Sequence, residues 1–229
     1  MLEKTQSKKE SLCTISTILS LCSEEEARLI TENQNVLTFN AGEVIVRQGS
    51  FISQYVFVKS GLLKVVLEGR NEKNTLLQFI NKNKFVGLSI VGNPNTYPFT
   101  IAAVVDSKVC FVRHDILSRI MKQNLRVNEL LLKNLADEHK FLYQKIDTLS
   151  NRNNHGKLAS AIMYITNGDF NIDILNRISR KELAELAGIS LESLNKILSD
   201  LRHEKVIEIN DKKITINKPD LIKTLSTVG

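Results

Sequence analysis

The sequence predicts an α+β protein in which two folded regions are joined by one long helix. Three observations lead to this prediction. Short β-like segments fill the first half, a long stretch without glycine or proline follows, and the last third alternates helical patterns with two short strands. Of the 229 residues, 42% are apolar and 24% are charged, so a packed core is expected. We expect a first domain over residues 1–124, a helix over 125–150 and a second domain over 151–229.

The first domain begins with a helix signal and continues as strands. Ser23 and Glu26 have the spacing of a capping box. Six segments rich in Val, Ile, Leu and Phe follow: Val44–Val46, Tyr55–Val58, Leu62–Leu67, Thr75–Ile80, Ile101–Val105 and Val109–Val112. Because no helix-length segment separates them, the pattern predicts an antiparallel β jelly roll or barrel.

A short helix near Asp115–Lys122 precedes the long one, which carries an apolar stripe. Its members are Leu132, Leu135, His139, Leu142, Ile146 and Leu149, at steps of 3, 4, 3, 4 and 3. This is a coiled-coil seam with Leu at every d position, and it predicts pairing with a second copy of the chain. Packing on its own barrel is the alternative, although Leu131, Phe141 and Tyr143 offer another face for that contact. The polar stretch 150–156 is expected to be a hinge, after which the chain should alternate helices and end in short strands.

The strongest pattern of the second domain lies between residues 179 and 203. Ser179 and Glu182 form another capping-box pattern, and Gly188 suits the positive-φ turn that ends a helix. Ser190 can then cap a second helix. The apolar positions of that helix fall on one face: Leu194, Ile197, Leu198 and Leu201. Two helices joined by a glycine turn predict a helix-turn-helix.

The outward face of the second helix carries side chains that can read base edges in DNA. The expected contacts are Ser190, Leu191, Glu192, Ser193, Asn195, Lys196 and Ser199, with Arg180 on the helix before. Glu can accept from cytosine, Lys can donate to guanine, and Asn and Ser can reach bases or phosphates, while Leu can touch a thymine methyl. A plain α-helical domain with a polar face is the alternative interpretation.

Two alternating segments, Val206–Ile209 and Lys213–Ile216, predict a β-hairpin wing around a turn at residues 210–212. This hairpin would place Lys212 and Lys213 on DNA phosphates. The whole chain has a net charge of +6, but from Ser150 onward 12 basic and 10 acidic residues give 12 − 10 = +2. A DNA-binding surface must therefore be basic locally rather than over the whole domain.

Other classes of function find little support. No apolar run approaches the roughly 18–20 residues that span a bilayer, and the N-terminus lacks a secretory signal, so we expect a cytoplasmic protein without a membrane partner. Cys13, Cys22 and Cys110 are too scattered for a disulfide framework. No HExxH, P-loop, GxSxG or triad pattern appears, so no enzyme is expected.

The order of these parts resembles the family of the cyclic-AMP receptor protein and the fumarate–nitrate regulator, the CRP/FNR family. Ala41–Gly49, Tyr55–Val65 and Ile178–Ile207 carry the resemblance. It implies a cyclic-nucleotide-binding-like jelly-roll sensor domain, a dimerisation helix and a C-terminal winged helix-turn-helix. It further implies a homodimeric bacterial transcription regulator that binds a palindromic double-stranded DNA operator, with RNA polymerase as another partner.

The resemblance places Ser190, Glu192 and Lys196 where family members contact DNA. Family members often carry Arg where Leu191 and Lys196 stand. Lys lacks the planar fork of Arg, so weaker discrimination between bases is expected at Lys196. Leu191 resembles the oxygen-regulator branch, which has an apolar residue there.

The same resemblance bears on what the barrel senses. Members that bind cyclic nucleotides hold the phosphate with a Gly–Glu pair and an Arg–Ser or Arg–Thr pair. Here Leu88 replaces the carboxylate and Tyr97-Pro98 replaces the arginine pair, and no Lys or Arg lies between Gly87 and Lys108. Because a buried phosphate without a cation is costly, cyclic AMP is not expected. An uncharged effector could instead contact Gly87, Leu88, Tyr97, Phe99 and Thr100, or these residues form ordinary core.

Two cofactors used by relatives remain to be considered. An iron–sulfur cluster is not expected, because three scattered cysteines cannot supply four ligands. Haem stays possible, with His114 and His139 as candidate ligands, although His139 at an a position can equally fix the register of the seam. The alternatives to a regulator of the CRP/FNR type with an unidentified signal are therefore a haem-based gas sensor or an interaction module with a degenerate DNA domain.

Overall fold

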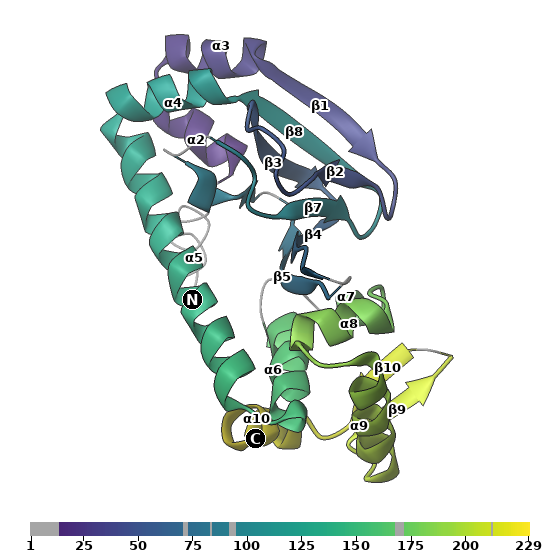
Figure 1. Ribbon diagram of the computed structural model, residues 1–229. Coiled ribbons are helices and arrows are strands. Elements are labelled where there is room, and N and C mark those ends of the chain that lie inside the picture. Colours follow the sequence, from purple (N-terminus) through teal and green to yellow (C-terminus); the bar gives the residue numbers. More distant parts are fainter. Residues whose placement is uncertain (1–13, 71–72, 83, 92–94, 168–171, 212) are drawn as a thin grey trace. The chain divides into compact units, whose positions relative to one another are not determined.

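The computed structural model describes residues 14–70, 73–82, 84–91, 95–167, 172–211 and 213–229 (Figure 1). The chain divides into two compact units. The first unit comprises Met1–Leu67 and Phe79–Phe141, and the second comprises Glu68–Gln78 and Leu142–Gly229.

Two four-stranded sheets form the β-rich region of the chain. One has the order β1 (Gln34–Phe39), β8 (Ser107–Arg113), β3 (Gln54–Ser60), β6 (Phe85–Val86), and the other has β2 (Val44–Val46), β7 (Thr100–Ala103), β4 (Leu62–Leu67), β5 (Thr75–Asn81). In β3, Val56 faces Phe111 on one side and Val86 on the other, and both pairings are antiparallel. The six predicted strands are confirmed, whereas β1 and β6 were not predicted as strands.

The centre of the first sheet is covered on both faces. Four consecutive residues of β3, Tyr55–Val58, are buried, a pattern that arises where neither face of a strand meets water. The rings of Phe57 and Phe85 stack with their centroids 4.7 Å apart, and Tyr55 meets Phe85 edge-on at 5.4 Å. These aromatic contacts fill the core between strands that are far apart in the sequence.

Three helices accompany these strands: α2 (Ile15–Leu21), α3 (Glu24–Glu32) and α4 (His114–Gln123). The capping box predicted at the start of α3 is present. The backbone N–H of Glu26 donates to Ser23 Oγ at 3.3 Å, and that of Ser23 donates to Glu26 Oε2 at 2.8 Å. The helix α2 was not predicted.

The long helix α5 runs over Leu125–Asn151, one residue further than the predicted end. Within the described residues, no helix combines the length and apolar character that a bilayer span requires.

The second unit contains helices α6 (Asn154–Asn167), α7 (Ile172–Leu175), α8 (Arg180–Ala187) and α9 (Leu191–His203), the hairpin β9 (Ile207–Asn210) and β10 (Lys213–Ile216), and a final helix α10 (Pro219–Val228). The prediction that the domain ends in strands was wrong, because α10 follows the hairpin. Its proline stands in the first turn, where no backbone donor is needed.

The predicted hinge is shorter than its polar composition indicated. Asn154, His155 and Gly156 belong to α6, so only Arg152 and Asn153 separate the two helices. The amide of Gly156 donates to Asn153 Oδ1 at 3.0 Å, which caps α6. A Cβ on Gly156 would lie 2.8 Å from backbone atoms of Gly229, so this glycine allows close packing near the end of α10 rather than a bend.

Candidate nucleic-acid interface

The helix α8 begins and ends as its sequence predicts. At its start, the backbone N–H of Ser179 donates to Glu182 Oε2 at 2.7 Å and that of Glu182 donates to Ser179 Oγ at 3.1 Å. At its end, Gly188 has φ +66°, a left-handed conformation that glycine adopts without a steric penalty. Its buried face comprises Leu183, Ala184, Leu186 and Ala187.

The helix α9 follows after a short turn and is capped by Ser190. The backbone N–H of Ser193 donates to Ser190 Oγ at 3.0 Å, and the two hydroxyls lie 2.9 Å apart in a second hydrogen bond. Leu194, Ile197, Leu198 and Leu201 are all buried, as predicted. One face of α9 is therefore anchored in the second unit, which leaves the opposite face available to a partner.

That opposite face brings together most of the predicted DNA contacts. Its exposed members are Leu191, Glu192, Asn195, Lys196 and Ser199, and Leu191 is 47% exposed although it is apolar. Ser193 is half-buried and Ser190 is exposed, but both hydroxyls already serve the start of the helix. The polar chemistry of the face therefore rests mainly on Glu192, Asn195 and Lys196.

Arg180 stands apart from this face. It is the first residue of α8 and is half-buried, and burial lowers the pKa of its guanidinium. Lys181 and Arg202, by contrast, are exposed.

The wing forms one residue later than predicted. The register pairs Asn210 with Lys213, so β9 continues to Asn210, and Asp211 in the turn has φ 48°. Lys213 is exposed, whereas Lys212 lies outside the described residues. Asn176, which the sequence did not single out, accepts the backbone N–H of Ile214 on its Oδ1 at 2.7 Å and ties the wing to the segment after α7.

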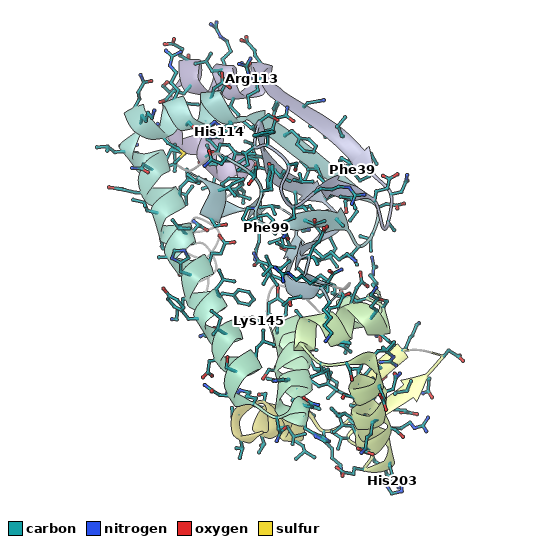
Figure 2. All side chains as sticks on the ribbon, viewed as in Figure 1. Phe39, Phe99, Arg113, His114, Lys145 and His203 are labelled. Carbon is teal, nitrogen blue, oxygen red and sulfur yellow. The ribbon has the colours of Figure 1, made fainter. Side chains whose placement is uncertain are left out.

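Three further basic residues at or near the C-terminal end of α9 were not predicted as DNA contacts: His203, Lys205 and Lys218. His203 and Lys205 are exposed, and Lys205 has the left-handed φ of 55° at the turn that ends the helix (Figure 2 labels His203). The ammonium of Lys218 donates to the carbonyl oxygen of Glu204 at 3.0 Å. Their placement follows from the αL turn and the hairpin, which the residue types alone do not indicate.

The seam residues of α5 are not buried within the chain. Leu132 and Ile146 are 57% and 59% exposed, and His139 is exposed too, while Leu135, Leu142 and Leu149 are half-buried. Leu131 is buried, as expected for the alternate face. Tyr143 is 70% exposed, so its assignment to a packed face was wrong.

The predicted effector residues of the barrel are all buried. Gly87, with φ +84°, precedes a short 3-10 turn (Leu88–Ile90), and a Cβ there would lie 2.9 Å from the Phe99 ring. The hydroxyl of Tyr97 donates to the carbonyl of Gln54 at 2.5 Å, and burial raises the pKa of Tyr97. Thr100 Oγ1 accepts the backbone N–H of Gln48 at 2.9 Å.

The candidate cofactor ligands already have structural contacts. His114 Nε2 lies 3.3 Å from Ser118 Oγ, its ring centroid lies 5.0 Å from that of Tyr55, and burial lowers its pKa. The Cys110 thiol donates to Gln34 Oε1 at 3.1 Å, and burial raises its pKa. Burial also raises the pKa of Cys22, to about 11. Cys13 lies outside the described residues. Among those described, no group of three or more His, Cys, Asp or Glu side chains could hold a metal ion.

A helix-turn-helix with an exposed polar face and a wing, in a chain that also carries a double β-sheet, defines a DNA-binding regulator with a sensor-like domain. Comparison with known proteins agrees. Residues 36–124 match the cyclic nucleotide-binding domain, and residues 156–225 match the Crp-like helix-turn-helix domain.

Relatives extend the match over most of the chain. The Global nitrogen regulator of Nostoc sp. is 22% identical over 80% of this chain and 86% of its own length. Transcriptional activator protein FnrL of Cereibacter sphaeroides is 20% identical over 93% of this chain and 88% of its own length. A solved structure from Eubacterium rectale, described as a CRP/FNR-family regulator, has a TM-score of 0.76 at 20% identity and covers 90% of this chain and 95% of its own. The chain belongs to the CRP/FNR family of DNA-binding transcription regulators.

Proposed function

We propose that the protein acts as a homodimer that places two copies of α9 in the major groove of a palindromic operator. The observation that carries this proposal is the division of α9 into a buried apolar face and an exposed face with Glu192, Asn195 and Lys196. Side chains of these types pair with cytosine, adenine and guanine edges. Two-fold symmetry would set half-sites about one helical turn apart.

The exposed stripe of α5 supports the dimer. Leu132, Ile146 and the half-buried leucines at the d positions recur at heptad spacing on a 27-residue helix. Side chains of this kind, exposed in one chain, bury apolar surface when a second copy packs against them. In this proposal, residues 1–124 form the sensor domain, 125–150 the dimerisation helix and 151–229 the DNA-binding domain.

Six of the predicted DNA contacts have one of two roles in this proposal. Lys196, Glu192 and Asn195 read bases, and Leu191 contacts a thymine methyl group. The exposed Lys213 and the neighbouring Lys212 bind phosphates on the flanking backbone, which fixes position without reading sequence. RNA polymerase is the further partner that a transcription regulator requires.

The signal at the barrel is proposed to be something other than a cyclic nucleotide. Leu88 and Tyr97 occupy the positions expected for the carboxylate and the cation, and both are buried. The Tyr97 hydroxyl already donates a hydrogen bond to the carbonyl oxygen of Gln54, and the Phe99 ring packs closely against Gly87. An anionic phosphate would find no fixed cation among these side chains, so an apolar or uncharged effector fits better.

A salt titration tests DNA binding. A duplex is selected from a random pool by the full-length protein, and its affinity is measured by fluorescence anisotropy beside that of a scrambled duplex. The selected duplex should bind at least about a thousandfold more tightly, and the affinity should fall steeply with salt. Equal affinity for both duplexes would contradict the proposal.

A further inference from the structure

One contact connects the long helix to the helix-turn-helix. Lys145 lies in the C-terminal half of α5 (Figure 2), and its ammonium donates to the carbonyl oxygen of Leu186. Both residues belong to the second unit. Burial of this side chain lowers its pKa to about 8, so the contact is made in partly desolvated surroundings.

The acceptor is a carbonyl that α8 cannot satisfy by itself. Leu186 is in the last turn of α8, where carbonyls lack intrahelical partners. The two amides that close the turn, those of Gly188 and Ile189, both donate to Ala184. The ammonium of Lys145 therefore caps the C-terminus of α8, where a positive charge is also favoured by the helix dipole.

A second contact lies one turn further along the same face of α5. A Cβ on Gly188 would stand 2.4 Å from Cδ2 of Leu149, so this leucine packs directly on the turn between α8 and α9. Lys145 and Leu149 are four residues apart, which places them on one side of the helix. Together they contact both ends of the segment 186–188.

We propose that Lys145 and Leu149 form a clamp that fixes the orientation of the helix-turn-helix on α5 and so sets the direction in which each protomer presents α9 to DNA. The proposal rests on the proposed function, because it assumes that two α9 helices meet one duplex. Lys145 is thus a positioning residue that touches no base. Leu149 also belongs to the dimer seam, so seam packing and helix orientation share one side chain.

The clamp predicts a particular pattern of DNA binding. One α9 can dock in one major groove at any orientation of its domain relative to α5. Two α9 helices of a dimer fit two half-sites together only if both have the correct direction and separation. Loss of the clamp should therefore weaken binding to a two-half-site duplex and leave binding to a single half-site unchanged.

The experiment compares full-length Lys145→Met, Lys145→Arg and wild type with the matched control Lys140→Met, which removes an exposed charge from the same helix. The probes are the duplex selected by wild type, the same duplex with one half-site scrambled, and duplexes with one base pair added or removed between half-sites. Circular dichroism melting reports whether each variant folds. Lys145→Gln, which keeps a neutral donor, provides a second variant if Lys145→Met does not fold.

We expect Lys145→Met to lose about tenfold in affinity for the two-half-site duplex, as removal of a charged hydrogen bond implies. Its affinity for the single half-site should stay within about twofold of wild type, and its penalty for altered spacing should shrink. Lys145→Arg should restore the wild-type pattern, and Lys145→Gln should fall between Lys145→Arg and Lys145→Met. The clamp is refuted if Lys145→Met matches Lys140→Met on every duplex, or if it loses single-site binding equally.

Amide hydrogen exchange without DNA separates this proposal from the proposed function. Peptides spanning residues 183–190 should exchange faster in Lys145→Met and regain protection in Lys145→Arg. Unchanged exchange would refute the clamp even if wild type binds its operator. If wild type prefers no palindrome, the proposed function fails, and the exchange result still decides whether the contact orders the turn.

Discussion

The outward face of α9 and the interior of the barrel offer opposite surfaces to a ligand. On α9, five neighbouring positions are exposed and three of them carry charged or amide groups. In the barrel, Leu88, Tyr97 and Phe99 are buried, and the Tyr97 hydroxyl is already bonded to Gln54. In the proposed function, DNA would meet side chains that already project from α9, whereas a ligand of the barrel would have to displace existing packing. Both regions match domains of the same family. Only α9 exposes polar side chains that a ligand could contact directly.

The tight packing of the barrel can be tested at a glycine pair. Gly61 has φ +99°, and a Cβ there would lie 2.1 Å from Ser107 Oγ and 2.7 Å from the Ser107 Cα. We expect Gly61→Ala to lower the free energy of unfolding by about 3–4 kcal/mol, measured by urea denaturation. The control is Gly42→Ala, with a similar φ of +87° but no atom within 4 Å, which should cost only about 1–2 kcal/mol. Equal losses of stability at both positions would mean that Gly61 is not closely packed against Ser107.

The clamp between α5 and α8 should give the next largest effect, on the pH dependence of stability. The pKa of Lys145 is lowered to about 8 in the folded state and is near 10.4 when unfolded. Between these values the unfolded chain binds more protons, so stability rises with pH. The free energy of unfolding of wild type minus that of Lys145→Met should therefore increase by about 2 kcal/mol from pH 7 to pH 10. A flat difference would contradict the burial of this ammonium.

Substitutions on the exposed face of α9 and on the wing should have different effects on DNA binding. Lys196→Ala should reduce the preference for the selected duplex over scrambled DNA by about 1–2 kcal/mol, because a base contact is lost. Lys213→Ala should weaken both duplexes alike and lower the salt slope by about one for each protomer. Fluorescence anisotropy across a salt series measures both, and identical behaviour of the two variants would remove the distinction between their roles.

The smallest expected effect concerns the turn after α9. Lys205 adopts φ 55°, a conformation that costs a residue with a Cβ about 1 kcal/mol. Lys205→Gly should raise the free energy of unfolding by about 0.5–1 kcal/mol in thermal or urea denaturation. Lys205→Ala removes the same charge but keeps the Cβ, so it should bring no such gain. Stabilisation by both variants would assign the effect to charge instead.

Local signals explain how much of this architecture could be predicted from the sequence. Three helices are capped by a serine whose partner lies only three residues away: Ser23, Ser179 and Ser190. In the same way, a glycine at position 188 is enough to predict the left-handed turn that ends α8. Such short-range patterns can be recognised in the sequence without knowledge of the three-dimensional structure. By contrast, β1 is mostly exposed, and its apolar residues Val36, Leu37 and Phe39 do not alternate regularly with polar ones, so its pattern did not reveal a strand.

Long-range contacts were beyond sequence reasoning. Lys145 bonds to a carbonyl 41 residues away, and nothing in either segment indicates the partner. Gly156 looked like part of a hinge, yet it permits contact with Gly229 at the other end of the second unit. The candidate DNA face was predictable because one helix supplies it, whereas the clamp requires two elements that only the fold brings together.

The number of protein chains bound to one selected operator duplex tests most directly whether the protein binds DNA as a dimer. Analytical ultracentrifugation of the full-length chain with that duplex should give a complex of two chains for each DNA molecule, and a duplex with one half-site scrambled should bind more weakly. A complex that contains a single chain, with equal affinity for both duplexes, would contradict a dimer that reads a palindrome through paired α9 helices.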